Sequence, residues 1–260
     1  MSTILVPLDF SPPSIDAYRF ALDLALLKNS KILVLHVIDL PIEQLKDEAI
    51  QKFQELEIKY NNDRIETSLF VELGGIIATI EEMIAEHKPD EVVMGTKGAS
   101  GLKEIVMGSN TQKIIRNSPV PVWTIPIHSD LKAIKNIVLP TDLDLNQADF
   151  IHLVLGIQKL FSATIHILYI KNGNDTNDRR DTLDDLDEFR KHYGFGNTTT
   201  SFRVAANQPK GILEFVSETS SQLVVMGTHA RKGLDHWFIG SLTEEIANQI
   251  TYPMFTAHLK

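Results

Sequence analysis

The stretch from residue 3 to residue 40, TILVPLDFSPPSIDAYRFALDLALLKNSKILVLHVIDL, decides the fold of this chain. An apolar run at 3–8 leads into a helical pattern at 12–28, and a second apolar run rich in β-branched residues follows at 31–37. Ser11 is typical of a helix N-cap and Pro12 of a first helical position. A strand, a helix and a second strand in this order favour a parallel sheet covered by helices.

The same pattern returns in the second half of the chain, at 136–173, as NIVLPTDLDLNQADFIHLVLGIQKLFSATIHILYIKNG. Both stretches open with an apolar run that ends in Pro-x-Asp, so Asp9 corresponds to Asp142, 133 residues later. Matching stretches at 90–125 and 221–257 keep nearly the same offset. A near-constant offset over half of the chain indicates duplication.

The boundary between the two copies falls near residue 130, in the polar segment PIHSDLKAIK, which has the composition of a linker. We therefore expect two domains, at 1–128 and 134–260. The first retains an intact glycine motif, described below, and the second carries an altered one.

Within the first copy, strand-like and helix-like segments alternate. The expected strands are 3–8, 31–37, 65–71, 91–95 and 119–125, and the expected helices are 12–28, 42–60, 76–87 and 109–118. In the second of these helices, Ile42, Ala49 and Phe53 fall on the predicted buried face, and Glu48 and Lys52 on the exposed side. Alternation of this kind implies an α/β fold with a mostly parallel sheet and helices on both faces.

Composition excludes several classes of function. The chain has 260 residues, of which 43% are hydrophobic, as in soluble globular proteins. It lacks cysteine, which rules out disulfides, a thiolate nucleophile and a cysteine zinc site, and fits a reducing compartment. The net charge of −9 argues against general nucleic-acid binding. With neither a signal-peptide pattern nor a membrane-length apolar stretch, we expect a cytoplasmic protein without a membrane partner.

A glycine-rich stretch, GTKGASGLKEIVMGSNT at 95–111, joins the fourth expected strand to the fourth helix. Ligands bind at the carboxyl ends of strands in open parallel sheets. Ser109 begins S-x-x-Q and Ser241 begins S-x-x-E, so both predict a capping box at a helix start. A helix N-terminus after a glycine-rich loop suits a phosphate. The alternative is that Ser109 only caps the helix and Gly108 only fits a turn.

These residues resemble a known family. Gly95-x2-Gly98-x9-Gly108-Ser109 is similar to the G-x2-G-x9-G-(S/T) signature of the ATP-binding universal stress proteins, the UspA-like family. VPLDFS, LHVID, VVMG and PVPVW extend the resemblance over the whole chain, twice. It implies two tandem copies of an open, five-stranded, Rossmann-like α/β sandwich with strand order 3-2-1-4-5.

The resemblance also implies a site for ATP, AMP or ADP, with or without Mg2+, in the first copy. Asp9 would hydrogen-bond the nucleoside end and Val37 would line the adenine pocket. Met94 and Gly95 would pass beside the ribose. Backbone N–H groups of the glycine motif would hold the phosphates. The implied site residues are Pro7, Leu8, Asp9, Val37, Met94, Gly95, Lys97, Gly98, Gly108, Ser109 and Asn110.

The second copy departs from the signature at Ala230, where the second glycine belongs. If that position needs a left-handed backbone, alanine costs roughly 1–2 kcal/mol. The nucleotide is therefore expected mainly in the first copy, and the second is expected to be weaker or vacant. The equivalent positions in the second copy are Asp142, Ile170, Gly227, Gly240 and Ser241.

No base is evident at the phosphate end, and the P-loop, G-x-S-x-G and G-x-G-x-x-G motifs are absent. We expect no catalytic residues and no metal ligands. The sequence favours a nucleotide-binding stress or regulatory protein with little or no turnover. A slow ATPase or adenylyl-transferring enzyme is one alternative, and an apo interaction or apolar-ligand module is another. An unidentified protein partner is expected. VPVWTI and YPMFTA could pair within one chain as a pseudo-dimer, and the chain could also form a homodimer.

Overall fold

The computed structural model describes residues 1–61, 64–96, 108–171, 179–205, 207–229 and 240–259. The chain divides into two compact units, Met1–Leu131 and Lys132–Lys260. Each unit is an α/β structure and is described by itself.

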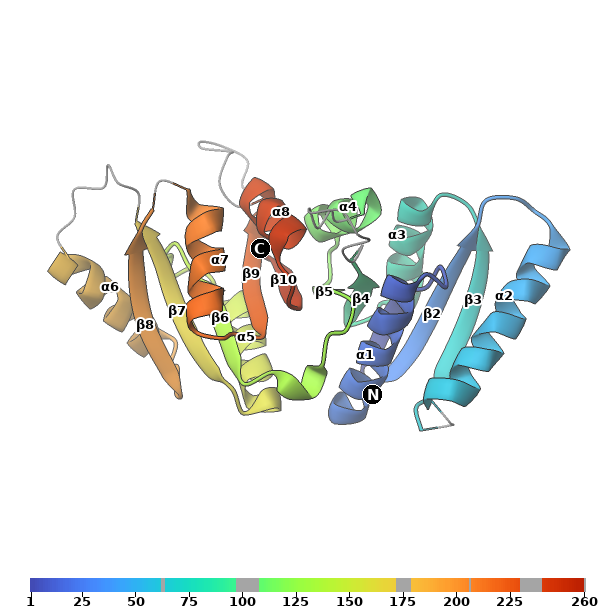
Figure 1. Ribbon diagram of the computed structural model, residues 1–260, viewed down its shortest axis with the longest axis horizontal. Helices are drawn as coiled ribbons and strands as arrows, with labels where there is room; N and C mark the ends of the chain where they lie inside the picture. The colour runs from blue at the N-terminus through green and yellow to red at the C-terminus, as the bar shows by residue number, and fades with distance from the viewer. Residues whose placement is uncertain (62–63, 97–107, 172–178, 206, 230–239, 260) are drawn as a thin grey trace. The chain divides into compact units, whose positions relative to one another are not determined.

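The first unit holds five strands in one parallel sheet. They are β1 (Thr3–Pro7), β2 (Lys31–Ile38), β3 (Thr67–Leu73), β4 (Glu91–Gly95) and β5 (Val122–Ile125). Their order is β3-β2-β1-β4-β5, and neighbouring strands run parallel. This confirms the strand order implied for the first copy and makes β1 and β4 neighbours (Figure 1).

Four helices cover this sheet: α1 (Pro12–Lys28), α2 (Glu43–Leu56), α3 (Ile76–His87) and α4 (Ser109–Asn117). Because crossovers between parallel strands are right-handed, the strand order places α1 and α2 on one face and α3 and α4 on the other. Contacts between α3 and α4 agree with this placement, and α2 runs along β3 (Figure 1). Ile4, Leu5 and Val6 of β1 are fully buried, as a central strand covered on both faces requires.

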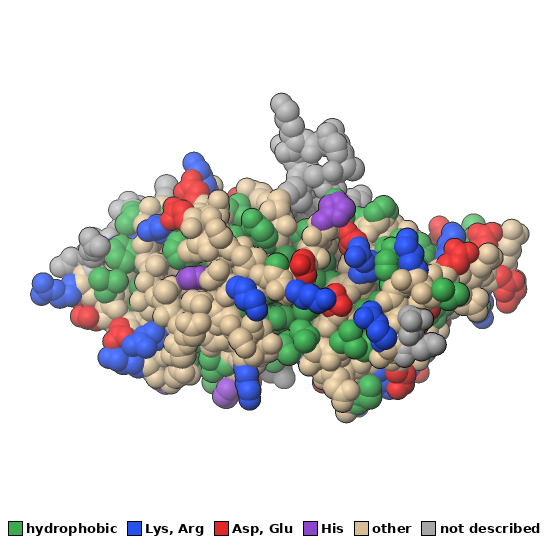
Figure 2. All heavy atoms as spheres, turned by 60° about the horizontal axis from the view of Figure 1, so that its bottom comes forward, with side chains coloured by type: hydrophobic (Ala, Val, Ile, Leu, Met, Phe, Trp, Pro, Cys, Tyr) green, Lys and Arg blue, Asp and Glu red, His purple; other side chains and the backbone are tan. Residues whose placement is uncertain are grey.

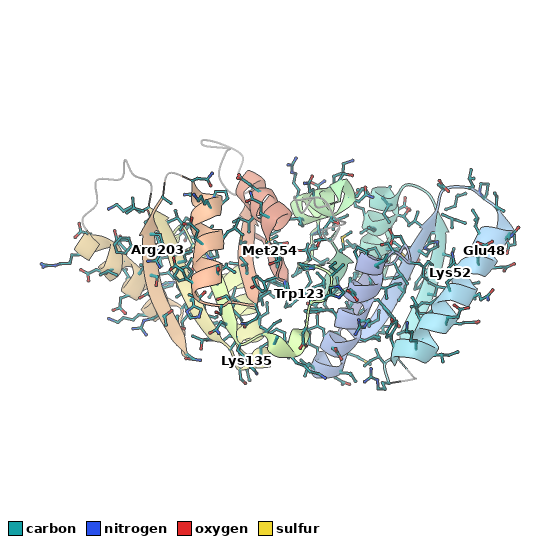
Figure 3. All side chains as sticks on the ribbon, viewed as in Figure 1. Glu48, Lys52, Trp123, Lys135, Arg203 and Met254 are labelled. Atoms are coloured by element: carbon teal, nitrogen blue, oxygen red, sulfur yellow. The ribbon has the colours of Figure 1, made fainter. Side chains whose placement is uncertain are left out.

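The second helix is amphipathic, with one correction to its expected faces. Ala49 and Phe53 are buried, whereas Glu48 and Lys52 lie on its solvent side (Figure 3). Ile42, expected on the buried face, is the N-cap residue of this helix and is exposed. The helix does not continue regularly to residue 60; it passes into a π-helical turn at Glu57–Asn61.

The second unit repeats the arrangement. Its strands are β6 (Asn136–Pro140), β7 (Thr164–Lys171), β8 (Thr198–Val204), β9 (Leu223–His229) and β10 (Met254–Leu259). Its helices are α5 (Ala148–Phe161), α6 (Arg179–His192), α7 (Gln208–Glu218) and α8 (Gly240–Gln249). The strands run parallel in the order β8-β7-β6-β9-β10, which matches the first unit and confirms the duplication.

The two units differ at the start of their first helix. The α1 helix begins three residues after Asp9, whereas α5 begins six residues after Asp142. A local turn takes the place of the missing helical residues: the backbone N–H and side-chain amide of Asn146 both donate to Asp144 Oδ1, at 2.9 Å. Side chains of this kind compete with helix formation by bonding the nearby backbone.

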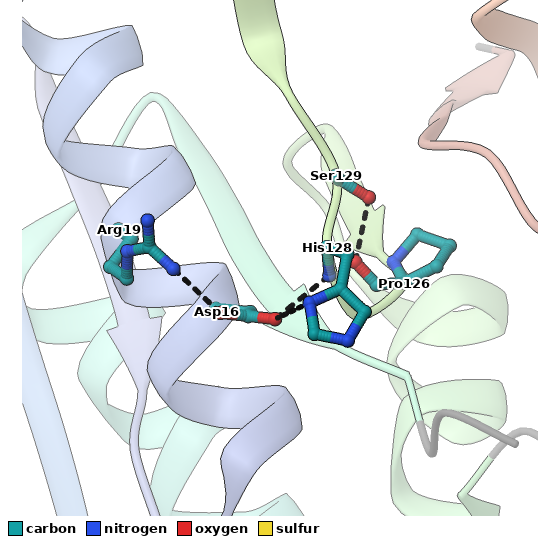
Figure 4. Close-up of polar contacts among 5 residues, drawn as sticks. All are labelled: Asp16, Arg19, Pro126, His128 and Ser129. Carbon is teal, nitrogen blue, oxygen red and sulfur yellow. Dashed lines mark hydrogen bonds and ion pairs between the residues drawn. The ribbon is translucent and has the colours of Figure 1, made fainter.

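The segment expected to be a linker is fixed to α1 at its beginning (Figure 4). The backbone N–H of His128 donates to Asp16 Oδ2 at 2.8 Å, and Arg19 pairs with the same carboxylate at 3.2 Å. The hydroxyl of Ser129 closes the turn by donating to the carbonyl oxygen of Pro126 at 2.6 Å. The first residues of this polar segment therefore belong to the first unit.

On the face shown in Figure 2, Lys and Arg side chains are interspersed with Asp and Glu side chains. Within the described ranges, none of the helices combines the length and apolar character needed to cross a bilayer.

Candidate functional site

A cavity of about 850 Å³ opens at the carboxyl ends of β1, β2 and β4 in the first unit. Its volume lies in the range of pockets that hold small molecules. Its wall is formed by these three strand ends, by the first turns of α1 and α4, and by the start of α3. The lining residues are Pro7, Leu8, Asp9, Ser11, Pro13, Ser14, Val37, Asp39, Gly74, Ile76, Met94, Gly95, Thr96, Gly108, Asn110 and Thr111.

Most of the residues implied by the sequence come together around this cavity. Those that line it are Pro7, Leu8, Asp9, Val37, Met94, Gly95, Gly108 and Asn110. Ser109 is exposed on α4 and is not among the lining residues. Lys97 and Gly98 lie outside the described residues.

Asp9 is held in a fixed orientation. Its Oδ1 accepts hydrogen bonds from the backbone N–H of Ser11 at 2.9 Å and from the Ser11 hydroxyl at 2.5 Å. Burial raises the pKa of Asp9, but hydrogen bonds from Ser11 and Ser14 outweigh it and hold the pKa below its usual value of 3.8. An ionised carboxylate only accepts hydrogen bonds. A ligand group that meets Asp9 must therefore donate, as an exocyclic amine or a hydroxyl does.

The residue after this aspartate has a left-handed backbone in both units. The φ angle is 62° at Phe10 and 64° at Leu143. This conformation costs a residue with a side chain roughly 1–2 kcal/mol. The same strain at the same place in both copies indicates that the fold constrains the position of the aspartate.

Gly95 is explained by packing within the chain. A Cβ at this position would lie 2.4 Å from the carbonyl oxygen and 2.6 Å from the carbonyl carbon of Pro13. The end of β4 and the start of α1 thus approach too closely for any side chain. At Gly95, therefore, it is the backbone of Pro13, and not a ligand, that comes too close for a side chain.

Gly108 has the opposite surroundings. A Cβ there would meet only Thr111 Oγ1, at 3.8 Å, and the backbone angles of −61° and 137° suit any residue. Neither packing nor conformation within the described residues requires glycine. Because Gly108 lines the cavity, its missing side chain leaves room there for a ligand.

The N-terminus of α4 is the strongest feature for binding an anion. Gly108 is the N-cap, and among the residues that the structure describes no side chain caps the helix. The N–H groups of Ser109, Asn110 and Thr111 precede the first intrahelical hydrogen bond, which Gln112 donates to Gly108 at 3.2 Å. Such free groups, with the helix dipole, favour an anion. The expected capping box is therefore wrong: Ser109 is the first helical residue, and the cap position belongs to Gly108.

The N-cap expectation for α1 is correct in position, although the side chain acts differently. Ser11 is the N-cap, but its hydroxyl donates to Asp9 instead of bonding the helix backbone. In the second unit, α8 already begins at Gly240, so Ser241 lies inside the helix and its expected N-cap position is also wrong.

Sequence reasoning missed several lining residues, including Ser14, Asp39, Thr96 and Thr111. Asp39 stands in the LHVID motif, two residues after Val37, at the same carboxyl end of the sheet. Its position was therefore a usable signal. Thr111 carries no such signal in the sequence. What places it at the cavity is a tertiary contact: its hydroxyl donates to the carbonyl oxygen of Gly95, 16 residues away, at 3.3 Å.

In the second unit, Asp142 is surrounded differently from Asp9. Its Oδ1 accepts the backbone N–H of Asp144 at 3.1 Å and the side-chain amide of Gln147 at 2.6 Å. Ile170 is buried near the end of β7, and Gly227 lies in β9. Ala230 lies outside the described residues.

In the part of the chain that the structure describes, no three His, Asp or Glu side chains are grouped so that they could hold a metal ion.

The chain was compared with known proteins. The model of the universal stress protein family matches residues 1–126 and again residues 133–258. Universal stress protein MJ0531 of Methanocaldococcus jannaschii is 29% identical over 140 residues, which cover 47% of this chain and 80% of that protein. Universal stress protein Sll1654 of Synechocystis sp. is 31% identical over 133 residues, which cover 48% of this chain and 85% of that protein.

The whole chain is similar to a solved structure, a universal stress protein from Archaeoglobus fulgidus. The TM-score is 0.81 at 20% sequence identity, with 99% of this chain and 98% of that chain covered. At this identity the likeness concerns the fold, and it extends over both units.

Proposed function

The chain belongs to the universal stress protein family, and on this premise we propose that it is a stress-response or regulatory protein that binds an adenine nucleotide. ATP is the proposed ligand, with AMP and ADP as weaker candidates and Mg2+ as a companion of the phosphates. The nucleotide is held mainly by the first domain, at 1–128, and the second domain, at 134–260, contributes little.

One observation carries this proposal: Gly108 has room for a side chain, needs none of glycine's special conformations, and lines a cavity beside an uncapped helix start. A phosphate accepting hydrogen bonds from the first turn of α4 accounts for the missing side chain. Asp9 accepts a hydrogen bond from the nucleoside, and Val37 and Met94 supply apolar contact.

Turnover is proposed to be slow or absent. Hydrolysis requires a positioned water and charge stabilisation as well as a nucleotide. The carboxylates that line the cavity, Asp9 and Asp39, follow β1 and β2, whereas the proposed phosphate site begins α4. A slow ATPase or an adenylyl-transferring enzyme is the second candidate function, and an apo interaction module is the third. A cytoplasmic location, an unidentified protein partner and pairing of VPVWTI with YPMFTA also remain predictions from the sequence.

The proposal predicts that Gly108→Val removes most nucleotide binding. A Cβ at this position meets only Thr111 Oγ1, at 3.8 Å, and Gly108 borders the cavity, so the fold is expected to persist. Calorimetric titration with ATP and AMP should show an affinity lowered by at least about tenfold. Gly240→Val, at the equivalent position of the second copy, is the matched control and should change little.

A parallel experiment identifies the ligand. The purified protein is denatured, and any released nucleotide is identified by mass spectrometry. Unhydrolysed ATP in the supernatant supports the proposal. Unchanged ATP affinity in Gly108→Val would refute the assignment to the first domain, and multiple-turnover release of ADP or pyrophosphate would favour the enzyme alternatives.

A further inference from the structure

The two units differ at one position beside the equivalent aspartates. The offset of 133 residues that pairs Asp9 with Asp142 also pairs Ser14 with Gln147. Both side chains are buried, at 7% relative exposure. The two units therefore present a short hydroxyl and a long amide at matching places.

In the first unit, the short side chain leaves the aspartate accessible. Ser14 is the third residue of α1, and its hydroxyl donates back to the carbonyl oxygen of Ser11 at 3.0 Å. Both Ser14 and Asp9 line the cavity. Ser11 orients Asp9 through two hydrogen bonds to Oδ1, and the Ser14 hydroxyl helps to lower the pKa of the same carboxyl group. Asp9 is nevertheless exposed at the cavity, so its carboxylate can accept a hydrogen bond from a ligand.

In the second unit, the longer side chain reaches its aspartate. Gln147 Nε2 donates to Asp142 Oδ1 at 2.6 Å. The late start of α5 accompanies this hydrogen bond. Gln147 is the N-cap of α5, whereas Ser14 is the third residue of α1. The backbone N–H of Gln147 is held separately, by the Tyr193 hydroxyl at 3.0 Å. Main chain and side chain are thus both fixed in place.

We propose that Gln147 is an internal replacement for a ligand's donor group and closes the second unit to nucleotides. The inference rests on the proposed function and deepens it, because it assigns the difference between the two sites to one pair of positions. A nucleoside entering the second unit would have to displace a buried amide from a carboxylate. Hydrogen bonds to charged groups are the more costly ones to break, and a buried amide left without a partner adds to the cost.

The proposal predicts a reciprocal exchange. Ser14→Gln should place an amide beside Asp9 and lower the ATP affinity of the first unit by at least about tenfold. Leu27→Gln, which adds an amide on the exposed side of the same helix and outside the cavity, is the control and should stay within about threefold of wild type. Calorimetric titration at constant salt measures both.

The opposite change should open the second unit. In a Gly108→Val background, Gln147→Ser should bind ATP at least about tenfold more tightly than Gly108→Val alone. Asn146→Ser is the matched control in the same loop, because the Asn146 amide bonds Asp144 and not Asp142. Circular dichroism verifies folding, and Gln147→Ala replaces Gln147→Ser if the latter does not fold.

The results separate the inference from the proposed function. If wild type binds ATP but Ser14→Gln binds it equally well, or Gln147→Ser gains nothing, the inference is wrong and the proposed function stands. If wild type binds no nucleotide, the proposed function fails. The gain of ATP binding in Gln147→Ser, or its absence, then decides the inference.

Discussion

Gly95 has no space for a side chain, because a Cβ there would lie 2.4 Å from the carbonyl oxygen of Pro13. Relieving such a contact requires a backbone shift, so Gly95→Ala should lower the free energy of unfolding by about 1–3 kcal/mol. Urea denaturation measures this change. Gly108→Ala is the control and should stay within about 0.5 kcal/mol of wild type, since its Cβ makes only an ordinary contact with Thr111 Oγ1, at 3.8 Å. Equal losses in both variants would contradict the packing explanation.

His166 gives the second unit a pH-dependent stability. Its ring nitrogens lie 2.7 Å from Thr199 Oγ1 and 3.1 Å from Asn136 Oδ1, so it links β7 to β8 and β6. Burial lowers the pKa of His166 below its usual value of 6.5. The unfolded chain therefore binds this proton more readily, and stability falls as the pH drops below about 6.5 until the folded-state pKa is passed.

His166→Gln removes this titration and keeps polar groups for both partners. Wild type should lose more stability than His166→Gln between about pH 7.5 and pH 5.5. Urea midpoints at the two pH values measure the difference, and other titrating groups cancel in the comparison. Parallel pH dependence of the two proteins would show that burial of His166 does not govern its protonation.

Two of the residues that sequence reasoning placed at the cavity lie at the ends of apolar strands. Asp9 comes just after β1 and Val37 lies near the end of β2, and the carboxyl ends of parallel strands share one edge. The packing reason for Gly95 was beyond prediction, since Pro13 precedes it by 82 residues and only the tertiary fold brings the two together. Ser14 was missed for a similar reason: as a helix residue it carries no signal that it borders a cavity.

At the scale of secondary-structure elements, the end of α2 depends on a polar network. The π-helical turn at Glu57–Asn61 directs Glu57 inward, where it accepts hydrogen bonds from the Tyr18 hydroxyl, from Asn61 Nδ2 at 3.0 Å and from Thr67 Oγ1 at 2.6 Å. Burial, together with the hydrogen bond to Glu57, raises the pKa of Tyr18 well above its usual value, so this phenol stays neutral. The network ties α2 to α1 and β3.

Glu57→Ala should lower the free energy of unfolding by about 2–4 kcal/mol, because the hydroxyl of the fully buried Tyr18 loses its acceptor. Thermal and urea denaturation measure this loss. Glu55→Ala on the exposed side of the same helix is the control and should change stability by at most about 0.5 kcal/mol. A loss in Glu57→Ala no larger than in this control would show that the network contributes nothing.

Element positions were predictable where the helix ends are clear. The helices at 12–28 and 76–87 match α1 and α3, each of which ends at a residue with a left-handed backbone. Helix starts were less predictable: S-x-x-Q at Ser109 fits a capping box, yet the adjacent Gly108 takes the cap position. The late start of α5 depends on the Asp144–Asn146 turn, which competes with a first helical turn that the repeat alone would predict.

At the scale of the whole molecule, the duplication made the domain organisation predictable. The nearly constant offset implied two similar domains, and both units have the same strand order. The proposed difference in nucleotide binding between the two copies was harder to predict. Ala230 was visible as a departure from the glycine motif, but Gln147 becomes meaningful only once its amide is seen 2.6 Å from Asp142.

A duplicated fold with one altered site predicts one nucleotide per chain. The first unit combines an oriented Asp9, an uncapped α4 and room beside Gly108, whereas in the second unit Gln147 occupies an oxygen of Asp142. Calorimetric titration with ATP should therefore give a stoichiometry near one per chain, and nucleotide released from the denatured protein should agree. Gly240→Val should leave that value unchanged, while Gly108→Val should weaken ATP binding by at least about tenfold. Two equivalent sites per chain would contradict the asymmetry, because then neither Ala230 nor Gln147 prevents binding. A stoichiometry of one that survives Gly108→Val and disappears in Gly240→Val would assign the nucleotide to the second unit instead.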